Sequence, residues 1–414
     1  MQNKKNVFFI LKERGFIEQV TDERKTIEVL DSPITCYIGF DPTAQSFHVG
    51  NLVPLMALAH MQSCGHRPIV VMGGGTGLIG DPSGKQQMRQ LLSEEEIETN
   101  LERLKQQVSR FIDFSDSKAL MLNNAKWLKE LRYLDFLRDI GRHFSVNKML
   151  SYETYKKRLE TGLNFIEFNY MLLQAYDFLY LYRNYNCILQ MGGNDQWGNI
   201  LAGIDLVRRL EGTTVYGITF PLITTASGAK MGKTERGAIW LDAKRTSPYE
   251  FYQYWINVDD KDVEKFLRLF TFLPLSEIER FKNLKDKDIR EAKEILAFET
   301  TKIIHGEEEA KKVRDASYKL FYQKVSDSDS IPTTFISQER LKNGIPAFVL
   351  FREVGLCSSG SEARRLIQSG GAYINEKKVK QFDQLIGEQD IDNRGIILLR
   401  VGKKNFHRIL VNKS

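Results

Sequence analysis

Short apolar runs separated by amphipathic segments dominate the first half of the chain. ITCYIGF (34–40), RPIVVMGG (67–74) and YNCILQMGG (185–193) have the length and apolar continuity of buried parallel strands. Between the first two, LVPLMALAHMQ has apolar residues at helical spacing, namely Leu52, Leu55, Met56 and Ala59. Pro54 is tolerated in the first turn of a helix, so this helix is predicted to begin near Asn51 or to kink there. A strand, a helix and a strand in this order predict a βαβ unit.

Polar and glycine-rich clusters follow these predicted strands. A doubly wound parallel α/β sheet binds its ligands at the carboxyl ends of its strands, so we assign residues 1–247 to a Rossmann-like catalytic domain of this class. Residues 248–324 have charged faces and few glycines, which predicts a helical domain. The stretch 325–340 is rich in Ser and Asp, and we interpret it as a linker before a small α+β domain, 341–414.

The positive charge of the chain is concentrated at its C-terminal end. The 414 residues carry 59 basic and 53 acidic side chains, a net charge of +6. Residues 341–414 contain 13 Lys and Arg against 7 Asp and Glu, which is also +6, so the first 340 residues sum to zero. A neutral body with a basic C-terminal segment indicates that this segment binds a polyanion.

Composition narrows the class of protein further. No apolar run approaches the roughly 20 residues that cross a bilayer, and MQNKKNVFFILKERGF predicts an N-terminal amphipathic helix rather than a signal peptide. The four cysteines form no CxxC pair, which argues against a zinc site and a disulfide framework. We therefore predict a cytoplasmic protein with reduced thiols, no membrane partner and no metal site.

The stretch CYIGFDPTAQSFHVGN (36–51) combines a strand end, a polar turn and a helix start. A helix N-terminus offers free backbone N–H groups and a partial positive charge, which attract phosphate. Gly50 leaves room for a flat ring against the backbone, His48 and Asn51 add side-chain donors, and Thr43 adds a hydroxyl. A lone histidine at a helix start is more often a cap or a surface residue. Here several donors converge on one predicted strand end.

The glycine-rich stretch MGGGTGLIGDPSGK (72–85) partly matches two nucleotide-binding motifs and satisfies neither. It matches GxGxxG from Gly75 to Gly80, but an Asp-Pro pair follows where a dinucleotide-binding motif needs a continuing helix. The P-loop pattern also fails, because one residue is missing between its glycines and no Ser or Thr follows Lys85. The alternatives are a tight turn, or a loop in which a substrate approaches the backbone and Asp81 faces a cation.

The stretch ASGAKMGKTERGAIWL (226–241) places Lys230, Lys233 and Thr234 in a loop of small residues before a short apolar strand, AIWL. Two lysines three residues apart are usually a solvated face. In a loop that moves, two ammonium groups can also stabilise a leaving pyrophosphate without covalent chemistry.

The segment EFNYMLLQAYDFLYLY (167–182) is mostly apolar. It carries three polar residues on one face of a predicted helix, namely Tyr170, Gln174 and Asp177. Buried polar side chains need hydrogen-bond partners. These three therefore either bond to other parts of the protein or line a pocket, in which Asp177 accepts from a hydroxyl group. MGGNDQWGN (191–199) adds Asp195 and Gln196 at the same edge of the sheet.

Together these segments resemble the bacterial tyrosyl-tRNA synthetases, a family of class I aminoacyl-tRNA synthetases. HVGN is similar to the family's HIGH signature, and KMGKT to its KMSKS loop. GFDPTA, GLIGDPS, NYMLLQAYDF and GGNDQWGN resemble further family motifs in the family's order. SSGSEARRLIQSGGAYINEKKV (358–379) resembles an S4 RNA-binding domain. Each motif alone is weak, but six in order across nearly the whole chain are specific.

Two departures from the family pattern stand out. Asn51 replaces the second histidine of HIGH, although its amide still donates a hydrogen bond. Gly232 and Thr234 replace the two serines of KMSKS, while both lysines remain. We take neither change as evidence of an inactive enzyme.

The resemblance implies roles for particular residues. The catalytic set would be His48, Asn51, Thr43, Lys230, Lys233 and Thr234. Tyrosine would be bound by Tyr37, Asp81, Tyr170, Gln174, Asp177 and Gln196, with its hydroxyl between Tyr37 and Asp177. ATP would be bound by Gly39, Asp41, His48, Gly50, Asp195 and Lys233. The tRNA would be bound by Arg364, Arg365, Lys377 and Lys378.

The reaction that the resemblance implies has two steps. The carboxylate of L-tyrosine attacks the α-phosphate of ATP, which gives tyrosyl-adenylate and pyrophosphate. The 3′-terminal adenosine of tRNA(Tyr) then takes the tyrosyl group. Mg²⁺ is expected to arrive with ATP, no protein-bound zinc is expected, and the family implies a homodimer.

Two other classes of protein stay open at this point. A nucleotidyltransferase that does not act on tRNA shares the fold and an HxGH-like turn, but it leaves the basic C-terminal segment and the polar face of 167–182 unexplained. An RNA-binding protein without catalysis does not explain Lys230 and Lys233. Tryptophanyl-tRNA synthetases resemble the chain less, because they lack an S4 tail and because Tyr37 with Asp177 suits a phenol.

Overall fold

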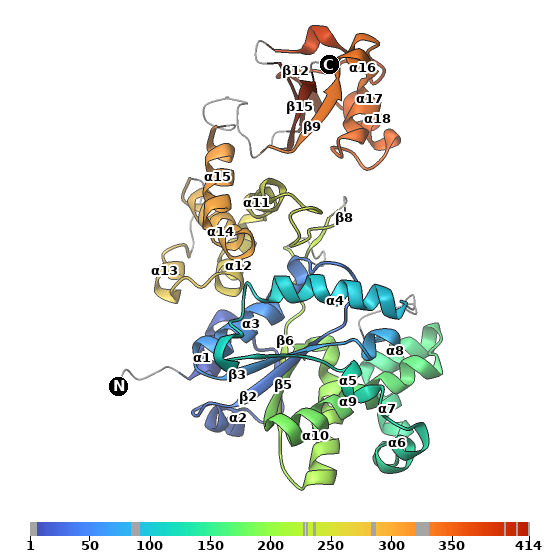
Figure 1. The fold of residues 1–414 in the computed structure, drawn as a ribbon. Helices are drawn as coiled ribbons and strands as arrows, with labels where there is room; N and C mark the ends of the chain where they lie inside the picture. Colours follow the sequence, from blue (N-terminus) through green and yellow to red (C-terminus); the bar gives the residue numbers. More distant parts are fainter. Residues whose placement is uncertain are drawn as a thin grey trace. The chain divides into compact units, whose positions relative to one another are not determined.

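The structure of the protein is a computed structural model that describes residues 6–83, 92–226, 228, 231–234, 237–282, 287–319, 331–392, 395–402 and 405–412. The chain divides into two compact units (Figure 1). The first comprises Met1–Gly232, Trp240–Asp242 and Asp259–Ile289, and the second comprises Lys233–Ile239, Ala243–Val258 and Arg290–Ser414.

A six-stranded sheet forms the centre of the first unit (Figure 1). Its strands are β1 (Gln19–Val20), β2 (Thr35–Phe40), β3 (Arg67–Met72), β4 (Leu120–Asn123), β5 (Cys187–Gly193) and β6 (Tyr216–Phe220). The order is β1-β6-β5-β2-β3-β4, with β1 antiparallel at the edge and the other five strands parallel. The winding reverses between β2 and β5, which places the switch point of the sheet at their carboxyl ends. The predicted doubly wound class is therefore confirmed.

Helices cover both faces of this sheet. On one face, α9 (Phe165–Tyr185) and α10 (Trp197–Glu211) pack on a core that includes Tyr37, Ile69 and Val71. On the other face lies α3 (Leu52–Ser63), where Pro54 is the third residue and costs no helical hydrogen bond (Figure 1). The predicted βαβ unit is therefore present, with its helix beginning after Asn51.

The remaining elements of the first unit are short. The helices are α1 (Val7–Arg14), α2 (Glu23–Val29), α4 (Glu94–Val108), α5 (Ala125–Leu128), α6 (Tyr133–Asp139), α7 (Val146–Ser151), α8 (Glu153–Thr161), α12 (Val263–Phe270) and α13 (Leu275–Glu279). The 3₁₀ turns are η1 (Val49–Asn51), η2 (Thr76–Leu78), η3 (Ser115–Ser117), η4 (Gly141–His143), η5 (Asn194–Gln196) and η6 (Asp260–Asp262). In the parts of the chain that the structure describes, no helix has the length and apolarity of a membrane span.

The second unit contains helices and a separate five-stranded sheet. The helices that precede this sheet are α11 (Pro248–Ile256), α14 (Lys287–His305), which starts in the first unit, and α15 (Glu307–Tyr318). The sheet has the order β12-β11-β14-β15-β9. Its strands are β9 (Thr333–Ser337), β11 (Ala372–Ile374), β12 (Lys377–Lys378), β14 (Ile396–Val401) and β15 (Asn405–Asn412).

The C-terminal sheet has its own hydrophobic core. Helices α16 (Gln338–Lys342), α17 (Ala347–Glu353) and α18 (Gly360–Gln368) contribute to that core together with the strands. Leu350, Phe351 and Ile367 on the helices are buried with Ile397 and Leu399 on β14. The pair β10 (Ile345–Pro346) and β13 (Leu385–Ile386), the 3₁₀ turn η8 (Glu388–Asp390) and the pair β7 (Lys233–Thr234) and β8 (Gly237–Ala238) complete the described elements.

Three predicted boundaries need correction. The predicted linker 325–340 is not a linker beyond residue 330, because β9 pairs in parallel with β15 and α16 follows it; residues 325–330 lie outside the described part. The predicted helical domain 248–324 does not form one body, because Asp259–Ile289 belongs to the first unit. The expected strand AIWL is regular only at Ala238, and Trp240 forms an isolated bridge with His48 instead.

Candidate active site

Asp177 lies in the middle of α9 and is 4% exposed. Its carboxylate accepts from Trp127 Nε1 at 2.7 Å and from Asn124 Nδ2 at 3.0 Å. Burial raises the pKa of Asp177 to about 7, although both hydrogen bonds oppose the rise; the charge of Asp41 adds to it. The site thus holds a carboxyl group that is fixed on two sides and expensive to ionise.

Tyr37 on β2 is 1% exposed, and its ring packs edge-on against Phe178 with centroids 5.3 Å apart. Its Oη is buried and has no hydrogen-bond partner among the described residues. Burial raises the pKa of Tyr37 well above its usual value, and the charges of Asp177 and Cys187 add to the rise. A buried hydroxyl without a partner costs free energy, so its place beside Asp177 points to a ligand with a polar atom.

A chain of hydrogen bonds connects Asp41, which follows β2, with Asp177 on α9. Tyr170 Oη donates to Asp41 Oδ2 at 2.8 Å, and Thr76 Oγ1 donates to Asp41 Oδ1 at 2.7 Å. Asn124 Nδ2 then donates to Thr76 Oγ1 at 3.0 Å, in addition to its bond with Asp177. The chain joins β2, η2, the end of β4 and α9. These are the elements that surround the carboxyl end of β2.

A second group of side chains joins the Gly-rich stretch to α10. Gln196 Nε2 donates to Asp81 Oδ2 at 2.7 Å, and Asp81 is 6% exposed. Asn199 Nδ2 donates to Gln174 Oε1 at 3.0 Å and to Gln196 Oε1 at 3.2 Å. Tyr170, Gln174 and Asp177 on the polar face of α9 therefore all have hydrogen-bond partners within the protein. This is one of the two alternatives that the sequence left open.

The HVGN turn is a capped helix start. His48 Nδ1 accepts from Gly50 N at 3.0 Å, and Asn51 Oδ1 accepts from His48 N at 3.1 Å. The His48 side chain thus satisfies the backbone N–H of Gly50, and the Asn51 side chain satisfies that of His48, in a capping box at η1. Asn51 fills the role of a capping residue here, so its departure from the HIGH pattern leaves the turn intact.

Within the KMGKT segment, the backbone of Met231 and Gly232 packs directly on this turn. Met231 is 2% exposed and its carbonyl oxygen lies 3.4 Å from the position of a Cβ on Gly50. Gly232 has φ of +82°, and a Cβ there would lie 2.7 Å from Val49 Cγ2. Glycine is therefore required at 232 for this packing, both by its left-handed conformation and by the lack of space.

Other predicted residues are placed less completely. Lys230 lies outside the described residues, and Lys233 and Thr234 form β7, whose backbone alone is described. Gly39 on β2, Thr43 in the turn after it and Asp195 on η5 are exposed at the same edge of the sheet. The structure therefore gathers most of the predicted tyrosine and ATP residues around the ends of β2 and β5, as expected from the switch point.

The predicted tRNA-binding residues lie in the second unit. Arg364 and Arg365 are exposed on α18, and Lys377 and Lys378 are exposed on β12. The guanidinium of Arg364 stacks 4.0 Å from the centroid of the Phe348 ring. Aromatic stacking of this kind holds an arginine in one orientation while leaving its N–H groups free to donate.

Sequence reasoning missed Asn124, Trp127 and Thr76, the residues that hold Asp177 and Asp41 in place. Asn124 directly follows β4, and its position at a strand end next to β3 was the available signal. Trp127 gave no signal, because only the packing of α5 against α9 makes it a partner of Asp177. The glycines at 73 and 74 also serve neighbouring side chains: a Cβ on Gly73 would lie 2.1 Å from Asp41 Oδ1.

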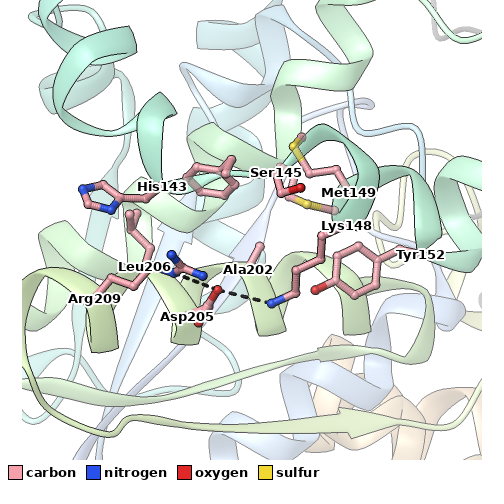
Figure 2. Close-up of a pocket in the computed structure, with 11 residues that line it drawn as sticks. His143, Ser145, Lys148, Met149, Tyr152, Ala202, Asp205, Leu206 and Arg209 are labelled. Carbon is pink, nitrogen blue, oxygen red and sulfur yellow. Dashed lines mark hydrogen bonds and ion pairs between the residues drawn. The ribbon is translucent and has the colours of Figure 1, made fainter.

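A pocket is lined by the segment 143–152, by Met171 on α9 and by α10. Lys148 and Arg209, both in the lining of this pocket, form ion pairs with Asp205 (Figure 2). None of the residues predicted for tyrosine, ATP or tRNA lines it. We therefore place the candidate active site at the ends of the strands and not in this pocket.

Comparison with known proteins shows the family to which the chain belongs. The family model for tRNA synthetases class I (W and Y) matches residues 30–322, and the model for the tyrosine–tRNA ligase SYY-like C-terminal domain matches 325–409. The tyrosine–tRNA ligase of Syntrophus aciditrophicus is 57% identical, with 98% of this chain and 99% of the relative covered. That of Desulfatibacillum aliphaticivorans is 54% identical, with 99% and 100% covered. A truncated mitochondrial tyrosyl-tRNA synthetase of Aspergillus nidulans is 32% identical, with a TM-score of 0.69 over 77% of this chain and 94% of that chain.

The chain belongs to the class I tRNA synthetases of the tryptophan and tyrosine type. Within that family, both its C-terminal match and its full-length relatives belong to the tyrosine branch. The predicted aminoacyl-tRNA synthetase with tyrosine–tRNA ligase activity is therefore confirmed.

Proposed function

We propose that L-tyrosine binds with its phenol between Tyr37 and Asp177, and that ATP lies across the HVGN turn. The observation that carries this assignment is the buried Tyr37 Oη without a hydrogen-bond partner among the described residues, beside a carboxyl that two donors fix. A phenol hydroxyl placed there accepts from Tyr37 and donates to Asp177. Phenylalanine leaves the Tyr37 Oη without a partner and offers Asp177 no donor, which disfavours phenylalanine.

The amino end of tyrosine is proposed to lie at Asp81, Tyr170 and Gln174. Asp81 supplies a carboxylate at a buried position, and the other two supply oxygen atoms from the adjoining face of α9. Gln196, which contacts Asp81 at 2.7 Å, would then lie close to the reacting carboxylate. With its phenol at Tyr37 and Asp177 and its ammonium group at Asp81, tyrosine would direct its carboxylate toward the HVGN turn.

The first step needs charge stabilisation rather than an enzyme nucleophile. His48, Thr43 and the N-terminal backbone of η1 would contact the phosphates, with Gly50 under the nucleotide ring and Gly39, Asp41 and Asp195 at its ribose side. Lys230, Lys233 and Thr234 would approach the departing pyrophosphate, and Asn51 would hold the turn. Donors that meet charge only as it develops lower the barrier without tightening the ground state.

Mg²⁺ is proposed to enter as the counterion of ATP. Among the described residues, no group of three or more His, Cys, Asp or Glu side chains could hold a metal ion. The absence of bound zinc and the cytoplasmic location stay predictions.

The basic C-terminal segment is proposed to hold tRNA(Tyr). Arg364, Arg365, Lys377 and Lys378 are exposed cations in one small domain, and phosphate contacts by such residues make binding fall as salt rises. Replacing Arg364 with Ala is expected to raise the KM for tRNA and to flatten its salt dependence, with no change in tyrosine activation. Charging kinetics at three salt concentrations measure both; an unchanged slope would remove Arg364 from the interface.

A homodimer is proposed from a set of exposed apolar side chains on consecutive helices of the first unit. These are Tyr133 and Leu134 on α6, Val146 on α7, Leu159 on α8 and Phe165 on α9, each at least half exposed. Leu134→Asp is expected to shift the sedimentation coefficient toward the monomer. Phe335→Asp, at a side chain of 63% exposure on β9, is the matched control and should leave it unchanged. A monomeric wild-type protein would contradict the proposal.

Amino-acid-dependent exchange of ATP with pyrophosphate tests the assignment of the phenol site. Each of the twenty amino acids is supplied in turn to the full chain. Exchange with tyrosine alone is the expected result. Equal exchange with phenylalanine would mean that Tyr37 and Asp177 do not read the hydroxyl.

A further inference from the structure

Helix α8 is anchored by a buried ion pair rather than by an apolar face. Arg158 on α8 and Glu167 in the first turn of α9 are each 2% exposed. Arg158 Nη2 donates to Glu167 Oε1 at 3.0 Å and to Oε2 at 2.8 Å, and its Nη1 donates to Thr161 Oγ1 at 2.6 Å. Among the α8 side chains that the structure describes, Arg158 and Tyr155 are the buried ones.

The carboxylate of Glu167 ties three pieces of chain together. Besides the guanidinium, its Oε2 accepts from Asn164 N at 3.3 Å and so caps the start of α9. A fully buried ion pair contributes little more to stability than apolar side chains of similar volume, because the loss of hydration offsets the attraction. The pair therefore adds specificity more than stability, because its geometry permits one arrangement of α8 and α9.

Tyr155 provides a second tie on the same face of α8. It is fully buried, and its Oη donates to the carbonyl oxygen of Phe168 at 3.1 Å. Burial raises the pKa of Tyr155, and the charge of Asp81 adds to the rise. One face of α8 thus contacts the first turn of α9 through both Arg158 and Tyr155.

The start of α8 contacts the third element of the site, the η5–α10 segment. Thr154 Oγ1 donates to the carbonyl oxygen of Asp195 at 3.3 Å. The Tyr152 ring lies 3.0 Å from the position of a Cβ on Gly198, and the same ring lines the pocket wall in Figure 2. The next residue, Gln196, donates to Asp81 at 2.7 Å, so a shift of α8 would reach Asp81 through η5.

We propose that Arg158 and Glu167 are positioning residues for tyrosine binding, which lock α8 on α9 so that Asp81 and Tyr170 keep the separation that the ammonium group needs. The inference rests on the proposed ammonium site. Neither side chain touches the substrate. Tyr170 lies one helical turn after Glu167, so the pair fixes the turn from which Tyr170 projects.

The test distinguishes an effect of the ion pair on the position of α8 from an effect on the stability of the protein. In the double variant Arg158→Met with Glu167→Gln, both charges are removed together, the side-chain volumes are kept and the new amide oxygen can still accept from Asn164 N, so the thermal unfolding temperature should stay near that of the wild type. The matched control is Arg183→Met with Glu211→Gln, an Arg–Glu pair at the other end of α9, 2.7 Å apart but 47% and 24% exposed. Asp81→Asn is the reference for a damaged ammonium site.

The readouts are the KM for tyrosine, the KM for ATP and kcat in pyrophosphate exchange, together with thermal unfolding of each full-length variant. We expect Asp81→Asn and the buried double variant to raise the KM for tyrosine about tenfold or more, the size that loss of a hydrogen bond to a charged group produces. The KM for ATP, the unfolding temperature and the control variant should stay close to the wild type.

Three outcomes would overturn the inference. A wild-type KM for tyrosine in the buried double variant, with a raised KM in Asp81→Asn, refutes the positioning role and leaves the ammonium site standing. No effect of Asp81→Asn refutes the ammonium site and, with it, the positioning role. An equal rise in both KM values, or a rise that accompanies a lower unfolding temperature, assigns Arg158 and Glu167 a merely structural role.

Discussion

The proposed phenol end and the proposed phosphate end of the candidate active site are built in different ways. At the phenol end, Tyr37 and Asp177 are buried on a strand and a helix, and Trp127 and Asn124 hold the carboxyl from two sides. At the phosphate end, the HVGN turn is partly exposed and the backbone of Met231 packs on Gly50. One end is set before substrate arrives, whereas the other must rearrange if a nucleotide lies on Gly50.

This difference suits the two tasks. Selection of a hydroxyl group needs fixed partners, because only a rigid site leaves phenylalanine's missing bonds unsatisfied. Release of pyrophosphate needs groups that approach and withdraw, which a loop between short strands supplies better than a helix. Selectivity should therefore respond to changes at the first end, and the rate of adenylate formation to changes at the second.

The largest expected effect concerns the protonation of Asp177. Its pKa is about 7 in the folded protein against 3.8 as the reference value, so the folded state binds the extra proton between these pH values. The contribution of Asp177 to stability therefore falls as pH rises from about 4 to about 7 and is constant above that range. Three pKa units correspond to about 4 kcal/mol.

Asp177→Asn removes this titration. Relative to the wild type, the unfolding free energy of the variant should rise by several kcal/mol between pH 4 and pH 7, on top of a constant offset from the altered hydrogen bonds. Denaturant titrations followed by circular dichroism at pH 4, 5.5 and 7 measure the difference. If it does not change with pH, the carboxyl has an ordinary pKa and the phenol end is not as dry as the structure indicates.

At the phosphate end, Lys233→Ala should lower kcat for adenylate formation by about 100- to 1000-fold, the typical cost of losing a donor to developing charge. The affinity for tyrosine should stay the same, because the phenol end is untouched. Single-turnover measurements with varied tyrosine separate the two quantities, and the exposed lysine in Lys118→Ala serves as the control. A near-normal rate would exclude Lys233 from the role.

The smallest effect is expected for Asn51→His, which restores the family's histidine. Asn51 already caps His48 N at 3.1 Å, so the change exchanges one capping side chain for another. We expect less than about a tenfold change in the KM for ATP, within the range of cap substitutions. A larger gain in activity would mean that asparagine impairs the nucleotide contact.

Much of the fold followed from the sequence where burial alone decides structure. The runs 34–40, 67–74 and 185–193 became β2, β3 and β5 because parallel strands buried on both faces need continuous apolar residues. Strand β9 was mistaken for part of a linker, because it is a polar edge strand of the C-terminal sheet. Its place depends on pairing with β15, more than 65 residues later in the chain.

The residues of the candidate site also divide into those that the sequence indicated and those that it did not. Asp81 and Asp177 were found because polar residues at strand ends or on an apolar helix are unusual locally, whereas Tyr37 was indicated only by the resemblance to the tyrosyl-tRNA synthetases. Trp127 was not found, because a tryptophan on a short helix is ordinary until α9 packs beside it. The buried pair of Arg158 and Glu167 also gave no local signal, since an arginine on the polar helix α8 is usually solvated and a glutamate in the first turn of α9 is usually a capping residue.

The central claim is that the buried hydroxyl of Tyr37 and the carboxyl of Asp177 read the phenol of tyrosine. The most direct test compares kcat/KM for tyrosine and for phenylalanine in pyrophosphate exchange by the wild type and by Tyr37→Phe, which keeps the ring against Phe178 and removes only the Oη. The account predicts that the tyrosine-to-phenylalanine ratio falls about tenfold or more in the variant, mostly through weaker use of tyrosine. An unchanged ratio, with tyrosine used as well as before, would contradict it.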